Sequence, residues 1–253
     1  MGKGKLSEKQ LHNAAEAIKI SKYAVAFTGA GISVESGIPP FRGENGLWNK
    51  YDPEVLNVSY FYQHPEESWK VIKEIFYEHF GKAEPNEAHK VLSQLEQRDI
   101  IKFIITQNID NLHHKAGSKR IAEFHGNSRK LICIECGKIY SVTEEIIAHI
   151  PPRCECGGIL KPDFIFFGEG IPKEAFEKSR QAAEMVDVMI LIGTTGEVYP
   201  ASMLPRMAAE RGAYIIEINP TESLYTDSIT DIFLKEKAAT AMQAVIETID
   251  NIT

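Results

Sequence analysis

The sequence predicts an α/β protein in which a doubly wound parallel sheet carries a smaller inserted module. Short, almost continuously apolar runs alternate with stretches of helical periodicity, as expected for parallel strands that helices cover on both faces. The four cysteines of the chain all fall between residues 133 and 156, outside this alternation. At 253 residues, the chain is long enough for one large domain with an insert.

The alternating elements follow one another along the chain. Residues 7–20 repeat apolar positions at helical spacing, and the run 23–28 predicts a buried strand that ends at a glycine turn. Further apolar runs predict strands at 101–106, 188–192 and 213–218. Helical periodicity predicts helices at 65–80, 86–98, 173–184, 201–211 and 238–250.

Two segments break the alternation. One holds aromatic residues and helical periodicity without a strand, and the other holds the cysteines together with Gly and Pro. We expect both to be inserts that pack together as a small domain, over residues 45–86 and 125–163. The doubly wound domain then comprises residues 1–44, 87–124 and 164–253.

Composition limits the classes of partner. Lys and Arg number 28 against 35 Asp and Glu, and the resulting net charge of -7 disfavours binding to a phosphate backbone. No apolar run approaches the roughly 18 residues of a membrane helix, and the N-terminal residues lack the apolar segment of a signal peptide. We therefore expect a soluble, cytoplasmic protein that binds neither nucleic acid nor a membrane.

The cysteines have a spacing close to that of a tetrahedral zinc site. Cys133 and Cys136 are separated by two residues, whereas Cys154 and Cys156 are separated by one, where two are usual. Four protein ligands leave no open coordination position, so the metal would be structural. The alternative is a pair of disulfides or four inert thiols.

A glycine turn closes the first predicted strand. Residues 29–33 read Gly-Ala-Gly-Ile-Ser, a context in which backbone N–H groups can approach a phosphate because glycine has no Cβ. Val34 stands where a dinucleotide fingerprint has its third glycine, so the usual dehydrogenase pattern is incomplete. A plain tight turn is the alternative. Arg42 offers a positive charge to the same phosphates.

Polar residues follow the strand at 101–106, at the end where open parallel sheets place ligand groups. Asp110 faces this crevice or, alternatively, caps the helix that follows. His125 lies between a short apolar run and the cysteine insert, a position that suits a general base in a cleft. A lone His at a strand end is also a common structural residue.

Two further motifs follow predicted strands, and a third is itself predicted to be a strand. Residues 193–195, Gly-Thr-Thr, close the strand at 188–192, and Asn219 closes the strand at 213–218. With the residues above they form a polar crevice long enough for a dinucleotide, unless each is a simple turn. The run 164–169 predicts an apolar strand, either in the core or at an edge where an extended peptide can pair with it.

Taken in order, these motifs resemble those of the sirtuin family, and the chain resembles a prokaryotic-type, single-module member. The resemblance covers about residues 15–245 and rests on eight motifs, at 29–33, 36–42, 107–110, 125–126, the cysteine quartet, 167–169, 193–195 and 198–201. The chain departs from the family pattern at Pro40, where most members carry Asp and some Thr, and at the short spacing of Cys154 and Cys156.

The resemblance implies a Rossmann-like NAD-binding domain with a zinc-binding and helical small domain, and an NAD-dependent protein-lysine deacetylase, a transferase. NAD is consumed in this reaction: the acetyl oxygen attacks C1′ of the nicotinamide ribose, nicotinamide leaves, and water yields free lysine and O-acetyl-ADP-ribose. The implied partners are an acetylated protein or peptide, and nicotinamide as product and inhibitor. One structural Zn²⁺ per chain is implied as well.

The resemblance also implies roles for individual residues. By similarity, His125 is the catalytic base toward a ribose hydroxyl, Asn108 is catalytic by orienting the ribose, and Asp110 holds the nicotinamide carboxamide. The other implied NAD-binding residues are Gly29, Ala30, Gly31, Ser33, Phe41, Arg42, Gln107, Ile109, Gly193, Thr194, Thr195, Asn219, Lys237 and Ala238. The implied peptide-binding residues are Phe167, Gly168, Glu169, Val198 and Tyr199, which would receive the peptide as an added strand.

The acyl group is expected to be acetyl. Sirtuins that prefer succinyl or malonyl lysine carry a Tyr and, three residues later, an Arg on the helix before a Glu-Pro-Asn turn. Here that helix offers Tyr77 but no Arg, and a buried carboxylate without a partner is costly. Lys70 or Lys73 is the alternative cation. Rival functions are a mono-ADP-ribosyltransferase, a nicotinamide-dependent dehydrogenase and a non-catalytic zinc-ribbon module.

Overall fold

The structure is a computed structural model that describes residues 7–41 and 46–252. Its main sheet has six parallel strands in the order β3-β2-β1-β7-β8-β9, which confirms the expected doubly wound fold class. The strands are β1 (Ala24–Thr28), β2 (Ile101–Thr106), β3 (Ile121–Glu123), β7 (Val188–Ile192), β8 (Tyr214–Ile218) and β9 (Ile232–Leu234). Because strand order reverses between β1 and β7, the carboxyl ends of these two strands flank the crevice where such sheets bind ligands.

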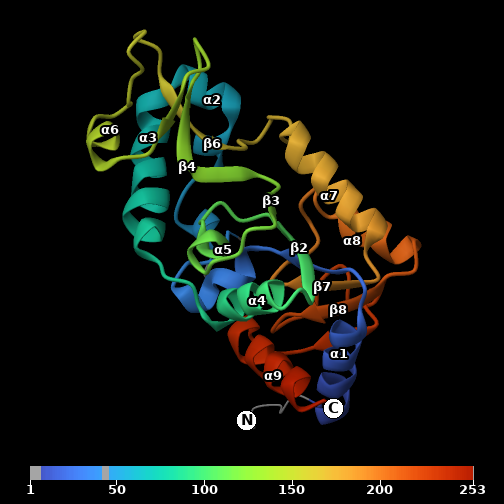
Figure 1. The fold of residues 1–253 in the computed structure, drawn as a ribbon. Coiled ribbons are helices and arrows are strands. Elements are labelled where there is room, and N and C mark those ends of the chain that lie inside the picture. The colour runs from blue at the N-terminus through green and yellow to red at the C-terminus, as the bar shows by residue number, and fades with distance from the viewer. Residues whose placement is uncertain (1–6, 42–45, 253) are drawn as a thin grey trace.

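Helices cover both faces of this sheet (Figure 1). One face packs against α1 (Glu8–Ile20), α4 (Glu87–Gln97) and α9 (Ala238–Asn251), and the other against α7 (Lys173–Met185) and α8 (Met203–Glu210). Each face has its own buried apolar cluster, which explains why the central strands are apolar along their whole length.

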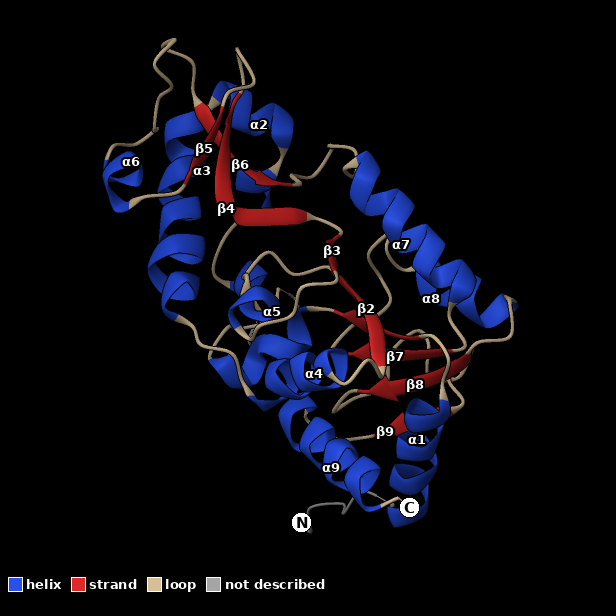
Figure 2. Cartoon of the chain, in the orientation of Figure 1, coloured by secondary structure: helices blue, strands red, loops and turns tan. Residues whose placement is uncertain are grey.

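A second, antiparallel sheet lies at the end of the molecule opposite α1 and α9 (Figure 2). Its strands, in the order β5-β4-β6, are β5 (Ile139–Ser141), β4 (Gly126–Cys133) and β6 (Leu160–Phe164). The helices α2 (Val58–Gln63), α3 (Pro65–Ile72) and α6 (Glu144–Ala148) pack near it, and Phe61 and Trp69 are fully buried in the shared core. The short helix α5 (Leu112–Lys115) follows β2.

The structure corrects three expectations about these elements. The segment 164–169 is not a strand: β6 ends at Phe164, and a turn follows in which the Glu169 N–H donates to the Phe166 carbonyl at 3.0 Å. The cysteine insert holds the three strands of the second sheet, which the sequence pattern did not predict. The helix expected at 65–80 is α-helical only to Ile72 and continues as a π-helical turn, Lys73–His79.

Within the described residues, no helix is both long and apolar enough to cross a membrane.

Candidate active site

Two glycine turns pack directly against each other at the carboxyl ends of β1 and β7. The Gly29 N–H donates to the Ile192 carbonyl at 3.0 Å, and the Gly31 N–H donates to the Gly193 carbonyl at 2.8 Å. A Cβ on Gly31 would lie 2.6 Å from the Gly193 Cα, and a Cβ on Gly193 only 2.2 Å from the Ile32 nitrogen. Glycine is therefore required here by the contact between the two turns. Ala30 begins a 3₁₀ turn that runs to Ser36.

A buried polar cluster lies behind the first turn. The Asn108 amide nitrogen donates to the Gly29 carbonyl at 3.1 Å and to the Ser33 hydroxyl at 3.2 Å, and that hydroxyl donates to the Asp110 Oδ2 at 2.7 Å. The other Asp110 oxygen accepts the Leu112 N–H at 2.9 Å, so Asp110 bonds the first N–H of α5 and faces Ser33 at the same time. Burial raises the pKa of the Asp110 carboxyl, while its hydrogen bonds lower it.

His125 is oriented by the residue that follows β2. Its Nδ1 lies 3.0 Å from the Gln107 carbonyl oxygen, so a proton on Nδ1 is donated there and Nε2 keeps its lone pair. The Gln107 amide nitrogen in turn donates to the Thr194 hydroxyl at 3.0 Å, which links His125 to the turn after β7. Burial lowers the pKa of His125, so the imidazole is neutral at pH 7 and able to accept a proton.

Hydrogen bonds connect the turn after β7 to Asn219, which follows β8. The Asn219 amide nitrogen donates to the Thr194 carbonyl at 2.9 Å and to the buried Glu217 carboxylate at 3.2 Å. Ala238 is buried at the start of α9, where the Ala239 N–H donates to Glu35 of the first turn at 2.7 Å. These bonds place the first residues of α9 beside the glycine turn after β1.

Several expected residues lie apart from this hydrogen-bonded set. Thr195 and Lys237 are exposed at its margin, and Ile109 is buried in the core of the second sheet. Phe41 packs against Trp48, with ring centroids 5.4 Å apart. Arg42 lies outside the described residues. The departure at Pro40 leaves its carbonyl bonded to the Leu47 N–H at 2.9 Å.

The expected peptide-binding residues lie on two loops. Phe167 is 46% exposed, and its backbone bonds to Leu56 and Val58, at 2.8 and 3.0 Å. Gly168 is exposed with a φ of 91°, and Glu169 is partly buried. On the other loop, Tyr199 is 74% exposed and Val198 is partly buried. No hydrogen bond joins the two loops in the described part of the chain.

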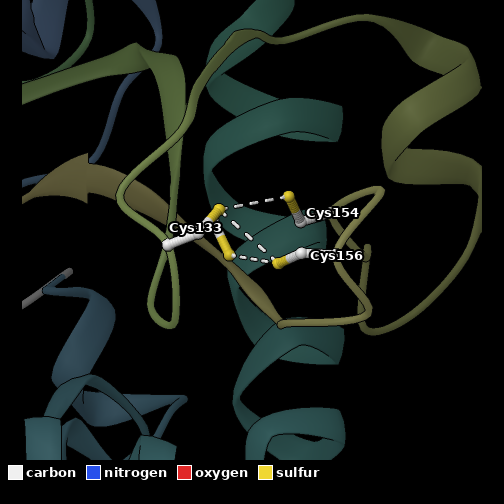
Figure 3. A group of neighbouring side chains, drawn as sticks. Cys133, Cys154 and Cys156 are labelled. Atoms are coloured by element: carbon white, nitrogen blue, oxygen red, sulfur yellow. Dashed lines mark hydrogen bonds between the residues drawn. The ribbon is translucent and has the colours of Figure 1, made fainter.

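The four cysteines converge although they come from two separate turns, and Figure 3 shows this for Cys133, Cys154 and Cys156. All four sulfur atoms lie within 4.8 Å of one another, with Cys133 to Cys156 and Cys136 to Cys154 at 3.5 and 3.6 Å. The cysteines are free, which excludes the disulfide interpretation. Thiolates around a tetrahedral zinc lie about 3.8 Å apart, so the quartet fits that metal in both chemistry and spacing.

Sequence reasoning missed two groups around the site. The Tyr140 hydroxyl lies 3.1 Å from the Cys154 sulfur and, together with hydrogen bonds from the neighbouring cysteines, lowers the pKa of that thiol to about 6. Glu123, two residues before His125, accepts hydrogen bonds from Nη1 and Nη2 of Arg129 at 2.8 and 2.7 Å. No spacing rule predicts either contact, because each depends on how separate strands and turns meet in the folded chain.

Comparison with known proteins agrees with this geometry. The model of the Sir2 family matches residues 29–200. An NAD-dependent protein deacylase of Aquifex aeolicus is 44% identical over 229 residues, 88% of this chain and 93% of that protein, and an NAD-dependent protein deacetylase of Saccharolobus solfataricus is 43% identical over 241 residues, 93% and 95%.

Solved structures agree as well. A Sir2 homologue in complex with ADP-ribose has a TM-score of 0.89 and 40% identity and covers 97% of each chain. A complex of Sir2 with a p53 peptide and NAD⁺ has a TM-score of 0.86 and 34% identity, covering 94% of this chain and 97% of that one. The fold and the site define a class of α/β protein. Its members have a crevice where the strand order reverses and a site of four cysteines. The chain belongs to the Sir2 family, as its motifs indicated.

Proposed function

We propose that this protein is an NAD-dependent protein-lysine deacetylase that moves the acetyl group of acetyl-lysine to the ADP-ribose part of NAD. The observation that carries the proposal is the orientation of His125, a neutral imidazole fixed through Nδ1 beside two glycine turns at the strand reversal. Relatives named NAD-dependent deacetylase and deacylase, more than 40% identical, support it.

The residues present fit NAD. The turn at Gly29–Gly31 leads into a 3₁₀ turn whose N-terminal backbone N–H groups can approach a phosphate. Asn108 and Ser33 offer a buried amide and a buried hydroxyl for the nicotinamide ribose, and Asp110 offers a buried carboxyl for the nicotinamide carboxamide. Thr194, Asn219 and the start of α9 extend the site toward the adenosine. Bound NAD supplies an electrophilic ribose carbon whose leaving group is nicotinamide.

The chain's own groups then have separate tasks. The Nε2 atom of His125 accepts a proton from a ribose hydroxyl, because Nδ1 is bonded to the Gln107 carbonyl. Asn108 fixes the ribose, and Phe41 keeps water from the reactive carbon. The balanced reaction consumes acetyl-lysine, NAD and water and yields lysine, nicotinamide and O-acetyl-ADP-ribose. Nicotinamide is expected to inhibit by occupying the site of the group that leaves.

The peptide is proposed to enter between the two loops. Gly168 is exposed, and no backbone hydrogen bond in the described residues involves it, so its N–H and C=O are available to an extended peptide. Tyr77 stacks on Trp69 with a buried hydroxyl, and Lys70 pairs with Glu66 at 3.0 Å on the surface. We expect these residues to form an apolar surface with no cation free to pair with a carboxylate. Such a surface favours the acetyl group over the charged succinyl group.

The zinc is proposed to be structural, one per chain and held by the cysteine quartet. We also propose the domain division 1–44, 87–124 and 164–253 for the NAD-binding domain and 45–86 with 125–163 for the small domain. The separate sheets and cores support it. A cytoplasmic location without nucleic-acid or membrane binding completes the proposal, supported by the net charge of -7.

One experiment separates this function from its rivals. Protein, NAD and an acetyl-lysine peptide are incubated, and all products are identified by mass spectrometry. Deacetylation predicts equal amounts of lysine peptide, nicotinamide and O-acetyl-ADP-ribose, and amounts lower by about a hundredfold or more with His125→Ala. ADP-ribose attached to a protein acceptor without loss of acetyl would support the transferase alternative. Reduced NAD would support a dehydrogenase, and no conversion the binding module.

A further inference from the structure

Lys161 is a buried lysine that the proposed mechanism does not use. It lies on β6 with only 9% of its surface exposed, although lysine is almost never buried unless its ammonium is paired. Its Nζ donates to the carbonyls of Pro162 and Phe164 at 3.1 and 2.8 Å, and it lies 2.9 Å from the Glu169 Oε2. An ammonium has three N–H donors, so all three have acceptors here.

The environment of this ammonium is apolar on its remaining side. The Nζ lies 4.2 Å from the centroid of the Phe166 ring, over its face. Burial lowers the pKa of Lys161, and the carboxylate of Glu169 acts in the opposite direction. Burying a charge costs desolvation free energy, and removing one partner of a buried pair costs stability. We therefore expect Lys161 on β6 to have a role beyond packing.

Glu169 extends the contact into the peptide-binding loop. Its Oε2 accepts the Phe166 N–H at 2.7 Å as well as the Lys161 ammonium, and its own N–H donates to the Phe166 carbonyl at 3.0 Å. Both backbone groups of Phe166 are therefore satisfied inside the loop. Phe166 itself is buried against Phe61, with ring centroids 5.2 Å apart.

These contacts decide which edge of the loop stays open. Phe167 uses its N–H and carbonyl on Leu56 and Val58, on one side of the segment. On the other side, Phe166 is closed by Glu169, whereas Gly168 is exposed and makes no backbone hydrogen bond among the described residues. Without the Lys161 contact, the carboxylate of Glu169 has no cation and gains by turning to water, which frees the Phe166 N–H and changes this edge.

We propose that Lys161 is a positioning residue for the acyl-lysine peptide, holding Glu169 and thereby the open backbone edge at Gly168. The inference rests on the proposed deacetylase function and concerns only the affinity for peptide. It assigns to the lysine of the segment Leu-Lys-Pro-Asp-Phe, residues 160–164, a task in substrate binding without contact to the substrate.

The test is Lys161→Met, which keeps the length and apolar stem of the side chain and removes the three donors. Lys130→Met is the matched control, because Lys130 is an exposed lysine on the neighbouring strand β4. The measurements are kcat and KM for an acetyl-lysine peptide, KM for NAD, and bound zinc. We expect the peptide KM to rise about tenfold or more, with the NAD KM and zinc content within about twofold of wild type, and no change for Lys130→Met.

Two further variants separate a positioning role from a purely structural one. Lys161→Arg keeps a cation beside Glu169 and should recover part of the peptide affinity. Glu169→Gln removes the charge while keeping an oxygen for the Phe166 N–H. Because the two residues act through one contact, the peptide KM of the double variant Lys161→Met/Glu169→Gln should rise by less than the product of the rises in the two single variants. If Lys161→Met does not fold, Lys161→Gln, which keeps N–H donors for the two carbonyls but has no charge for Glu169, decides the question by the same KM comparison.

The failures are distinguishable. Wild-type protein that converts no acetyl peptide overturns the proposed function and this inference with it. Active wild type with an unchanged peptide KM in folded Lys161→Met overturns the inference alone. Equal rises in the KM for peptide and for NAD would also overturn it, since they would indicate general damage to the fold.

Discussion

The contact between the two glycine turns predicts a large effect of a single methyl group. In Gly31→Ala, the new Cβ would lie 2.6 Å from the Gly193 Cα and 2.9 Å from the Gly193 oxygen, both of them backbone atoms. The turn after β7 must move by about 0.8 Å, from 2.6 to 3.4 Å, to restore ordinary contact. Such overpacking costs about 1–3 kcal/mol, and loss of the 2.8 Å bond between the Gly31 N–H and the Gly193 carbonyl adds about 1 kcal/mol.

Together these effects give a loss of roughly 2–4 kcal/mol in the free energy of unfolding. Because the displaced turns form the proposed phosphate and ribose surface, we expect the KM for NAD to rise about thirtyfold, the factor that corresponds to about 2 kcal/mol. Urea unfolding and steady-state kinetics measure the two quantities. Gly81→Ala is the control, since its Cβ would have its nearest contact at 4.0 Å. A Gly31→Ala protein with wild-type stability and NAD KM would refute the reasoning.

Three further predictions concern the base, the metal and the acyl group. His125→Ala should lower kcat about a hundredfold or more with NAD binding retained, and near wild-type turnover would remove His125 from the mechanism. Because burial lowers the pKa of His125, the acid limb of kcat/KM in wild type should have its midpoint below 6.5, so activity persists as the pH falls from 7 and is lost only beneath that value. Cys154→Ser should lose zinc and soluble protein together, whereas wild type without stoichiometric zinc would contradict the metal site. Matched acetyl and succinyl peptides should differ in kcat/KM in favour of acetyl, and a succinyl preference would mean that a cation such as Lys73 enters the pocket.

The large sheet could be predicted from sequence because its strands are buried on both faces. Every residue of β7 is buried, so the run 188–192 carries the same apolar signal along its whole length. The small sheet gave no such signal. β5 has no buried residue, and the register of β4 against β6 shifts between Gly126 and Leu131, so its pairing depends on contacts distant in the sequence.

The site divides in the same way. Residues at strand ends, such as Asn108 and Thr194, could be predicted because the topology alone brings the carboxyl ends of neighbouring parallel strands to one edge. The sequence explained Gly29 and Gly31 by the approach of a phosphate, whereas the structure requires them for the contact with the turn at Gly193. Buried charges such as Lys161 and Glu217 could not be predicted, because a charged residue in a sequence reads the same whether water or a carbonyl satisfies it.

His125 joins the two sheets, and its geometry depends on both. β3 ends two residues before it and β4 begins one residue after it. Its ring is held by the Gln107 carbonyl after β2 of the large sheet, while its own carbonyl accepts the Ile165 N–H just after β6 of the small sheet, at 2.9 Å. The corner at Gly126 admits no Cβ, which would lie 2.3 Å from the Asp163 oxygen. We therefore expect a zinc ion that stabilises the small sheet to stabilise the orientation of His125, the proposed base, as well, without taking part in the reaction.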